Sequence, residues 1–243
     1  MTTGTELEGR TCLVTGASRG IGRAIARRLD ASGGSVIAAA RPSEALNALA
    51  QEMSKRTILL GADATSDSFL EKLDALPPLD ILVNNLGTNV PRLMEEVDDA
   101  VLDSMLELNI RATYRISRAV VRRMNPDGRV INITSQMGHV GSARRTVYCM
   151  TKHAIEGLTK AMAIELAPRD IKVNSVAPTF VETELTKPML ADPDFAAFVK
   201  RMIPLGQLAD VEDVARAVVF LAGPGGRMIT GQSLIVDGGW TAQ

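Results

Sequence analysis

The chain has 243 residues, of which 46% are hydrophobic, with 27 Lys and Arg against 28 Asp and Glu. This near-neutral charge excludes the strongly basic surface that draws a protein to nucleic acid or to an acidic membrane, so neither partner is expected. The first ten residues are polar where a signal peptide is basic and then apolar, and the apolar runs are too short to span a bilayer, which predicts a cytoplasmic protein. The cysteines, Cys12 and Cys149, match no disulfide or metal-ligand spacing, so no metal site is expected.

Short apolar runs alternate along the chain with longer amphipathic ones. Strands are predicted at residues 11–15, 35–40, 57–60, 80–85, 129–134, 171–178 and 233–237, and these runs lack the polar alternation of half-exposed strands. Helices are predicted at residues 20–32, 43–54, 66–76, 99–124, 146–167 and 211–223, where apolar residues recur every three or four positions. This alternation predicts an α/β fold, with a doubly wound Rossmann-type sheet of seven parallel strands and helices on both faces. No linker interrupts residues 1–243, so a single domain is expected.

A glycine-rich segment, TGASRGIG, follows the first predicted strand and leads into a helix, with Gly16, Gly20 and Gly22 in G-x3-G-x-G spacing. Glycines let the backbone turn tightly and approach a pyrophosphate, while the N-terminus of the helix offers free N–H groups. No Gly-Lys-Ser/Thr follows, which excludes a P-loop. A strand-to-helix turn requires glycine in any case, but its place in the first unit of a doubly wound sheet predicts a dinucleotide site.

The end of the second predicted strand bears on the choice of dinucleotide. It reads Ala39, Ala40, Arg41, without the acid that would hold the ribose 2′-hydroxyl of NAD. Arg19, in the glycine turn, adds a second cation on the same side. We therefore expect NADP to be preferred over NAD, the alternative being that both arginines are solvated loop charges.

Polar residues follow or interrupt the later apolar runs. Asn84, Asn85 and Gly87 end the fourth predicted strand, Ser135 ends the fifth, and Asn109 lies within an otherwise apolar helix. In open α/β sheets, ligands bind at the carboxyl ends of the strands. Each residue has a structural alternative, such as a loop cap or a satisfied core amide, but together beside a glycine turn they predict an active site.

Tyr148 and Lys152 lie one helical turn apart on a predicted helix. A free phenol titrates near pH 10. An ammonium group nearby, together with a cationic nicotinamide ring, would lower the pKa of the phenol and favour phenolate. The Y-x-x-x-K spacing alone is common, but beside the other polar residues it predicts an acid–base pair.

Residues 179–208 break the alternation of strands and helices, because they contain three prolines and no predicted strand. A long irregular segment after a late strand is often a lid, so a substrate lid is expected here, the alternative being an extra pair of surface helices. Its apolar residues suit either an acyl chain or core packing: Leu185, Met189, Leu190, Phe195 and Phe198.

From GRTCLVTGASRGIG to LIVDGGW, these motifs resemble the short-chain dehydrogenase/reductase family over nearly the whole chain. The resemblance implies reversible hydride transfer between NAD(P) and a ketone or secondary alcohol. It implies four catalytic residues, Asn109, Ser135, Tyr148 and Lys152. The implied cofactor-binding residues are Gly16, Ser18, Arg19, Gly20, Ile21, Gly22, Arg41, Asp63, Ala64, Asn85, Gly87, Tyr148, Lys152, Pro178, Val181 and Thr183.

The resemblance also implies a role for each catalytic residue. Tyr148 would be the general acid in ketone reduction and the general base in alcohol oxidation, while Ser135 would hold the substrate oxygen. Lys152 would bind the nicotinamide ribose and lower the pKa of Tyr148. Asn109 would hold a water that relays protons from Lys152 to solvent, and Asp63 would accept a hydrogen bond from the adenine amino group.

The chain departs from the family pattern at two positions. Leu86 stands where the family usually has alanine in NNAG, which would tighten the nicotinamide pocket. Thr179 replaces the glycine of P-G-x-x-x-T, which leaves the backbone path there less certain, whereas Thr183 matches the residue expected to bind the carboxamide.

The segment between Ser135 and Tyr148 is expected to select the substrate. We expect Ser135, Gln136, His139, Arg144, Arg145 and Tyr148 to contact it. Arginine matches carboxylate geometry, so a sugar, polyol or hydroxy-acid type of substrate is favoured, although solvated loop charges explain the same residues. The alternative substrate is a 3-oxoacyl thioester, since the chain also resembles 3-oxoacyl-carrier-protein reductases. A nucleotide-sensing protein without catalysis is less expected, because both Tyr148 and Lys152 are present.

The resemblance finally implies a homotetramer. The surfaces expected to pair are the helices at residues 99–124 and 146–167 and the terminal LIVDGGW. Core packing would explain the same apolar residues.

Overall fold

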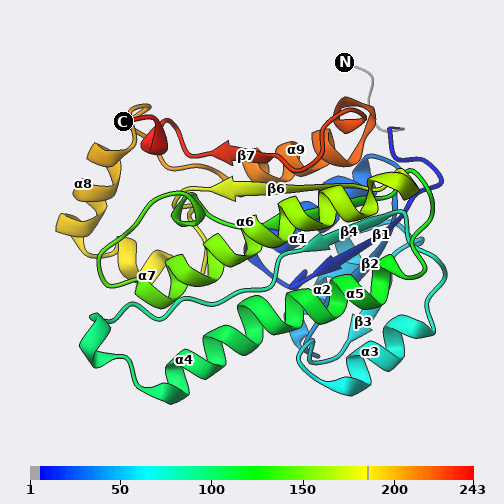
Figure 1. The fold of residues 1–243 in the computed structure, drawn as a ribbon, viewed down its shortest axis with the longest axis horizontal. Coiled ribbons are helices and arrows are strands. Elements are labelled where there is room, and N and C mark those ends of the chain that lie inside the picture. The colour runs from blue at the N-terminus through cyan, green and yellow to red at the C-terminus, as the bar shows by residue number, and fades with distance from the viewer. Residues whose placement is uncertain (1–5, 185) are drawn as a thin grey trace.

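A computed structural model of the chain describes residues 6–184 and 186–243. At its centre is a seven-stranded parallel sheet in the order β3-β2-β1-β4-β5-β6-β7 (Figure 1). The strands are β1 (Thr11–Thr15), β2 (Ser35–Ala40), β3 (Ile58–Gly61), β4 (Ile81–Asn84), β5 (Arg129–Ile133), β6 (Lys172–Pro178) and β7 (Ser233–Val236). The predicted fold class is confirmed, and each predicted strand end lies within one residue of its observed position.

Helices cover both faces of the sheet. They are α1 (Gly20–Ala31), α2 (Glu44–Glu52), α3 (Asp67–Asp74), α4 (Asp99–Leu106), α5 (Thr113–Val121), α6 (Thr146–Leu166), α7 (Lys187–Leu190), α8 (Pro193–Met202) and α9 (Val211–Ala222). Neighbouring strand residues point to opposite layers, so Val14 packs with α1, α2 and α9 while Leu13 packs with α3, α5 and α6 (Figure 1). Within the described residues, no helix has the length and apolar character needed to cross a membrane.

The predicted helix at residues 99–124 is not one regular α-helix. A π-helical segment, Glu107–Ala112, separates α4 from α5. A π turn adds a residue to the helical turn and is frequent at functional sites. The prediction of a continuous helix was therefore wrong in this detail, and the interruption contains Asn109.

The segment at residues 179–208 forms the two helices α7 and α8 and packs on a cluster of aromatic side chains. The ring of Phe180 lies 5.6 Å from that of Phe195 and 5.8 Å from that of Trp240, measured between centroids. Val199 and Ile203 complete the buried part of this cluster with Met137, which follows β5. The segment is therefore a pair of helices with its own apolar core. One residue of its predicted apolar face, at position 185, lies outside the described residues.

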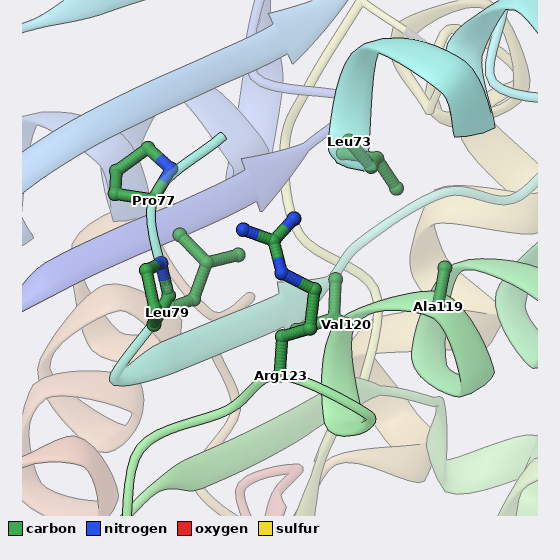
Figure 2. Close-up of a pocket in the computed structure, with 7 residues that line it drawn as sticks. Leu73, Pro77, Leu79, Ala119, Val120 and Arg123 are labelled. Carbon is green, nitrogen blue, oxygen red and sulfur yellow. The ribbon is translucent and has the colours of Figure 1, made fainter. Parts of the chain in front are cut away.

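A small hollow lies between α3, α5 and the loop that precedes β4 (Figure 2). Its volume is about 10 Å³, which leaves room for about one water molecule. The lining is mostly apolar, and the one charged side chain, Arg123, donates a hydrogen bond to the Leu76 carbonyl at 2.8 Å. This hollow offers neither volume nor free polar groups to a ligand.

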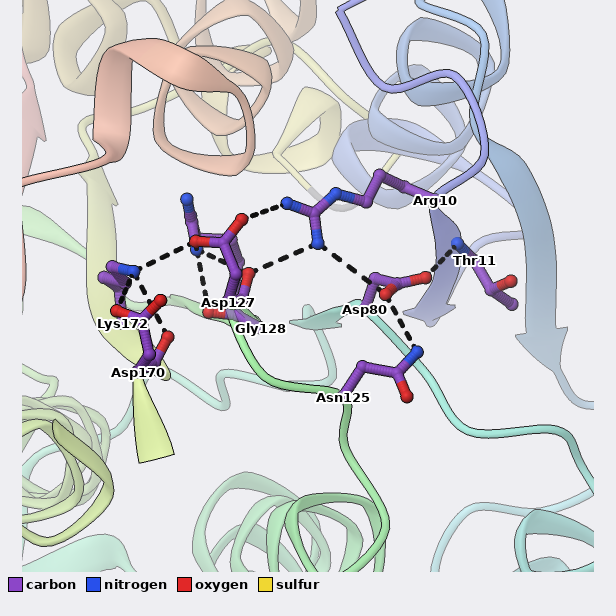
Figure 3. A network of polar contacts seen from close by, with 9 residues as sticks. Arg10, Thr11, Asp80, Asn125, Asp127, Gly128, Asp170 and Lys172 are labelled. Carbon is purple, nitrogen blue, oxygen red and sulfur yellow. Dashed lines mark hydrogen bonds and ion pairs between the residues drawn. The ribbon is translucent and has the colours of Figure 1, made fainter. Parts of the chain in front are cut away.

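Charged side chains join the strands at the amino edge of the sheet (Figure 3). Asp127 lies between three cations: Arg129 at 2.8 Å, Lys172 at 3.0 Å, and Arg10. Asp80 in turn accepts a hydrogen bond from the backbone N–H of Thr11 at 2.8 Å. Burial acts to raise the pKa of Asp127, but hydrogen bonds from the three cations hold it well below its ordinary value. The network ties β1, β4, β5 and β6 together at this edge.

Candidate active site

The topological switch point of the sheet lies between β1 and β4, which are neighbours in the sheet although two strands separate them in the chain. The glycine turn follows β1 here. Gly16 has φ +65° and Gly20 has φ +54°, in the left-handed region that favours glycine. At Gly22 an added Cβ would lie 2.2 Å from the Gly16 carbonyl oxygen, so α1 starts in direct contact with the turn. The glycine spacing of the motif thus follows from the geometry of this turn.

The N-terminus of α1, like those of α5, α6 and α7, has neither a side-chain cap nor an acid in its first turn, unlike those of the remaining helices. Side chains cap α2, α3, α4, α8 and α9, and each of these helices has an acidic residue in its first turn. By contrast, Arg19 makes no side-chain cap on α1, and the first turn of α1 contains no acid. Its backbone N–H groups and positive dipole end are thus available to an anionic ligand. This arrangement fits the pyrophosphate of a dinucleotide.

Residues from three strands meet at this turn. The Asn85 side chain donates hydrogen bonds to the carbonyls of Thr15 at 3.1 Å and Gly16 at 3.3 Å, so it holds the end of β4 against β1. An added Cβ at Gly20 would lie 3.5 Å from Thr183, which follows Pro178, the last residue of β6. Leu86, one of the departures from the family pattern, also lies against the turn, since its Cδ2 would be 3.5 Å from a Cβ at Gly16.

The remaining predicted cofactor residues surround this turn. Ser18 and Ile21 are half-buried within it, and Val181 forms an isolated parallel bridge with Ala209. Asp63 follows β3 and is exposed. Hydrogen bonds from the backbone and side chain of Thr65 hold the pKa of Asp63 below its ordinary value.

The two predicted phosphate-binding arginines are both exposed. Arg41 directly follows β2 and lies near enough to Asp63 for its charge to act on that carboxyl group. Arg19 lies at the start of α1. Ala64, next to Asp63, is half-buried and packs against the apolar cluster that includes residues of α3, α5 and α6. The carboxyl ends of β1, β2 and β3 thus present cations and a carboxylate to the solvent.

Tyr148 and Lys152 occupy successive turns at the start of α6. The Lys152 ammonium donates a hydrogen bond to the Ile133 carbonyl at 2.9 Å and lies 5.6 Å from the centroid of the Tyr148 ring. Burial lowers the pKa of Lys152 to about 8, although the charge of Glu156 acts to raise it. The amine can therefore change its protonation state not far from neutral pH.

The pKa of Tyr148 is raised, contrary to the expectation that Lys152 lowers it. Burial is the main cause, and the groups that act against burial are Ser135, through a hydrogen bond, and Arg145, through its charge. Lys152 is not among the groups that act on this pKa. The cation that favours phenolate in this structure is therefore Arg145, whose electrostatic effect the sequence did not suggest.

Asn109 is held by both atoms of its side-chain amide. Its Oδ1 accepts a hydrogen bond from the Thr88 N–H at 2.8 Å, and its Nδ2 donates to the Thr88 carbonyl at 2.9 Å and to Thr151 Oγ1 at 3.1 Å. An added Cβ at Gly87 would lie 3.5 Å from Lys152 Nζ and 3.6 Å from Asn109 Oδ1. Because both atoms lie within 3.6 Å of this one point, the structure brings Asn109 Oδ1 and Lys152 Nζ to the same side of Gly87.

Ser135 and Tyr148 line a cavity of about 80 Å³ that α7 and Phe180 partly cover. Its lining residues are Asn89, Ser135, Gln136, Met137, Tyr148, Thr179, Phe180, Thr186 and Met189. Several buried polar atoms in this lining have no hydrogen-bond partner within the part of the chain that the structure describes: both side-chain polar atoms of Gln136, Thr179 Oγ1 and Asn89 Oδ1. Such atoms destabilise a fold unless a ligand or water satisfies them, so they mark a place for a polar molecule.

Three of the residues expected to contact substrate, His139, Arg144 and Arg145, are not among the residues that line this cavity. His139 Nε2 is 2.9 Å from Ser233 Oγ on β7 and 3.3 Å from Glu156 Oε1. Arg144 has φ +61° and an exposed side chain, 3.9 Å from Glu96. The lining instead includes Thr179, Asn89 and Met189. The sequence pointed to Thr179 as a departure from the family pattern and to Met189 as part of the apolar lid face, whereas Asn89 carried no signal.

Comparison with known proteins agrees with this geometry. Residues 16–241 match the family described as Enoyl-(Acyl carrier protein) reductase. The chain is 40% identical over 240 residues to the 3-oxoacyl-[acyl-carrier-protein] reductase of Vibrio harveyi, covering 96% of this chain and 98% of that protein. It is 37% identical over 237 residues to the L-xylulose reductase of Mesocricetus auratus, covering 96% and 97%. A solved structure from Beutenbergia cavernae, named as an NAD(P) dependent gluconate 5-dehydrogenase with bound NADP, is 36% identical, covers 98% of both chains and superposes with a TM-score of 0.90.

Proposed function

The chain belongs to the short-chain dehydrogenase/reductase family and is an NAD(P)-dependent oxidoreductase, and we propose that it interconverts a small polar ketone and the corresponding secondary alcohol. The observation that carries this proposal is the cavity at the start of α6. It brings the Ser135 hydroxyl and the Tyr148 phenol together, and its other buried polar atoms lack partners. A small polar molecule would satisfy these atoms.

In the proposed reaction the cofactor, when bound, supplies or accepts the hydride. The glycine turn and the free N-terminus of α1 would hold its pyrophosphate, and Lys152 would hold its nicotinamide ribose. Tyr148 would donate its phenolic proton to the carbonyl oxygen in reduction and take it back from the hydroxyl in oxidation. The Ser135 hydroxyl would donate a hydrogen bond to the same oxygen and favour the charge that develops on it.

Lys152 would supply the proton that Tyr148 loses, and Asn109 would hold a water that connects Lys152 with solvent. Since the pKa of Lys152 is lowered to about 8, this amine can give up a proton near neutral pH and recover it from solvent. Asn109 Oδ1 and Lys152 Nζ lie on the same side of Gly87, where a bound water would reach both side chains. Arg145 would assist by favouring the phenolate form of Tyr148.

The proposal is tested by following NADPH oxidation with a panel of small polar ketones and NADP reduction with the matching alcohols. We expect turnover of at least one pair by the wild type and loss of roughly 10²–10⁴-fold in Ser135→Ala with NADPH binding unchanged, because the substrate oxygen loses its hydrogen bond. NADPH binding by the wild type without turnover of any panel member would contradict the proposal and favour a nucleotide-sensing protein.

A 3-oxoacyl thioester is the second candidate substrate. The 40% identity to the Vibrio harveyi reductase favours it. The lining opposes it, since an apolar acyl chain would leave the buried polar atoms of Gln136 and Thr179 without partners. Acetoacetyl thioesters of coenzyme A and of acyl carrier protein, assayed beside the polar panel, distinguish the two substrates through the ratio of their kcat/KM values.

We further propose that NADP is preferred over NAD, because Arg41 follows β2 where an acid would repel a 2′-phosphate. Arg41→Ala should weaken NADPH binding about tenfold, the loss of one charge-assisted contact, and leave NADH binding unchanged. A preference for NADH in the wild type, or equal binding in both proteins, would contradict this assignment.

We also propose a cytoplasmic homotetramer. Exposed apolar residues on the expected pairing helices support it, with Ile164 on α6 79% exposed and Tyr114 on α5 50% exposed. Light scattering after gel filtration would measure the assembly, and Ile164→Lys should weaken it. A monomeric wild type would contradict the proposal.

A further inference from the structure

We propose that the substrate is an anion, a hydroxy acid or its oxo form, and that Arg145 binds its carboxylate under α7. This inference rests on the proposed oxidoreductase function, because it names the substrate class of the same site. It goes further in assigning one residue to recognition of a charge that the ketone and alcohol chemistry does not itself require.

The first observation is the burial of a guanidinium without an anion. Arg145 is 5% exposed, and its Nη1 is buried without a hydrogen-bond partner among residues 6–184 and 186–243. Its Nη2 is 3.4 Å from the Met189 sulfur, a weak acceptor, and its Cζ lies 5.6 Å from the centroid of the Phe180 ring. Burial lowers the pKa of Arg145, and no Asp or Glu of the described residues is among the groups that act on it. A buried cation of this kind is unfavourable unless a ligand pairs with it.

The second observation is where this guanidinium lies. The two side chains that Arg145 contacts, Phe180 and Met189, both line the cavity that contains Ser135 and Tyr148. Arg145 directly precedes α6, and Tyr148 follows it by three residues, about one helical turn. An anion seated on Arg145 beneath Met189 would therefore belong to a molecule whose remainder extends along the cavity toward the phenol.

The third observation concerns the rest of that molecule. Gln136 is 1% exposed, and neither its Nε2 nor its Oε1 has a partner, while Thr179 Oγ1 and Asn89 Oδ1 are also unpartnered. An amide with both ends free binds a hydroxyl that donates to Oε1 and accepts from Nε2. The lining thus suits a hydroxylated chain with a carboxylate at one end, and arginine pairs with a carboxylate through two parallel hydrogen bonds.

The adjacent Arg144 carries the same charge as Arg145 but has different surroundings. Arg144 is exposed and lies 3.9 Å from Glu96, so it has both solvent and an anion. Arg145 has neither, although the two residues are neighbours in the chain. Arg145 is thus buried against two side chains of the cavity lining, Phe180 and Met189, whereas Arg144 is exposed to solvent.

The test compares substrates that differ only in the anionic group. D-gluconate is compared with D-glucitol and 3-hydroxybutyrate with 1,3-butanediol, with NADP, in wild type, Arg145→Gln, Arg145→Lys and Arg118→Gln. We expect the wild type to favour the acid of at least one pair by roughly 10- to 150-fold in kcat/KM, the effect of a charge-assisted hydrogen bond. Arg145→Gln should abolish this ratio and Arg145→Lys keep part of it. Arg118, whose Cζ lies 5.9 Å from the Tyr114 ring on the exposed face of α5, is the matched control, and its variant should keep the full ratio.

The ratio of kcat/KM for the acid to that for the neutral substrate distinguishes carboxylate recognition from catalysis. Because Arg145 also favours the phenolate of Tyr148, its loss will slow both members of a pair, but only carboxylate binding changes the acid-to-neutral ratio. An equal loss on acid and neutral substrate, or a wild type that prefers the neutral member of each pair, would overturn the carboxylate site.

A binding measurement keeps failure of this inference distinct from failure of the proposed function. Butyrate and butyramide have no hydroxyl to oxidise, so calorimetric titration into the protein saturated with NADP reports recognition alone. Butyrate binding that exceeds butyramide binding, and disappears in Arg145→Gln, supports the carboxylate site even if no substrate pair is turned over, a result that would overturn the proposed function. Turnover of the neutral substrates combined with equal binding of the two probes would overturn the carboxylate site and leave the proposed function standing.

Discussion

The amino and carboxyl edges of the sheet differ in whether their charged side chains have partners of opposite charge. At the amino edge, Asp127 is surrounded by Arg10, Arg129 and Lys172, and all four charges have partners (Figure 3). At the carboxyl edge, the buried cation Arg145 lacks an anion, and the amide of Gln136 lacks any hydrogen bond. Arg129 Nε at the amino edge is also buried without a hydrogen-bond partner among the described residues, but the same guanidinium has Asp127 as its counter-ion. The difference therefore teaches that a buried charge without a counter-ion, rather than charge density, identifies the site.

The pKa values of the two edges follow from the same difference. Three cations outweigh burial at Asp127 and keep the carboxylate charged. Burial prevails at Lys152 and Tyr148, so the pKa of the amine falls to about 8 and that of the phenol rises. Asp127 at the amino edge thus stays charged across the neutral range, whereas Lys152 at the carboxyl edge can change its protonation state.

The largest expected effect is that of removing the phenolic hydroxyl. Tyr148→Phe should lower kcat by about 10³-fold or more, because general acid–base catalysis of this size depends on that one proton donor. NADPH binding should stay within about twofold, since the substituted atom lies on the substrate side of the site. Stopped-flow reduction of the preferred ketone measures the rate, and activity within tenfold of wild type would contradict the assignment of Tyr148.

Gly22→Ala should be the most damaging change in the glycine turn. A Cβ there would lie 2.2 Å from the Gly16 carbonyl oxygen and 2.4 Å from Asn85 Nδ2, so the turn must shift. We expect a loss of about 1–3 kcal/mol in the free energy of unfolding and at least tenfold weaker NADP binding. Gly157→Ala on α6 is the control, since nothing lies within 4 Å of the added Cβ. Equal NADP affinity in Gly22→Ala and Gly157→Ala would show that the glycine turn does not bind the cofactor.

Asp127→Asn tests the opposite edge, where we expect an effect on stability alone. Asn also tolerates the left-handed backbone of Asp127, at φ +60°. The loss should be about 1 kcal/mol at pH 7, after allowance for solvent screening of a side chain that is 42% exposed. Because the folded pKa is lowered, this stability is present above the unfolded pKa of about 3.9 and is lost as pH falls toward the folded pKa.

A change in kcat/KM in Asp127→Asn, with the free energy of unfolding unchanged, would contradict the contrast between the amino and carboxyl edges of the sheet. Urea unfolding at pH 7 and at pH 3 measures the stability difference, which should narrow at the lower pH. Asp103→Asn, at an exposed position on α4, serves as the control. It should leave the free energy of unfolding within about 0.5 kcal/mol of wild type and kcat/KM unchanged.

The smallest expected effect is a shift in a pH profile. Glu156 raises the pKa of Lys152, so Glu156→Gln should move the inflection of kcat/KM near pH 8 to lower pH. The glutamine amide oxygen can still accept the hydrogen bond that Ser175 Oγ donates to Glu156 at 2.7 Å, but the amide nitrogen then faces Thr134 and Ser233, which donate to the other carboxylate oxygen. The substitution therefore removes these hydrogen bonds as well as the charge. An inflection at the same pH in both proteins would show that Lys152 is not the group that titrates.

Much of this architecture follows from short-range patterns in the sequence. The strands are apolar runs because two helical layers cover the sheet, and the glycine turn and the Tyr148–Lys152 spacing depend on neighbours within one or two turns. Local patterns therefore predict the sheet and the residues that converge at its carboxyl edge.

Other features depend on contacts that no local pattern encodes. The π-helical segment at Asn109 has the same apolar spacing as an α-helix. The side-chain amide of Asn109 forms hydrogen bonds with Thr88 and Thr151, which are 21 and 42 residues away in the chain. Likewise, nothing in the sequence distinguishes Arg144 from Arg145. The structure separates them, because Arg144 has a left-handed backbone and an exposed side chain while Arg145 packs against Phe180 and Met189.

The most direct test of the account is the fate of the transferred hydrogen. NADPH deuterated at C4, prepared separately as each of the two stereoisomers, is incubated with the enzyme and the preferred ketone, and the alcohol is analysed by mass spectrometry. The account predicts one deuterium at the carbinol carbon with one of the two stereoisomers, and none of this product with Tyr148→Phe in the same time. An alcohol product that carries no deuterium with either stereoisomer would contradict it.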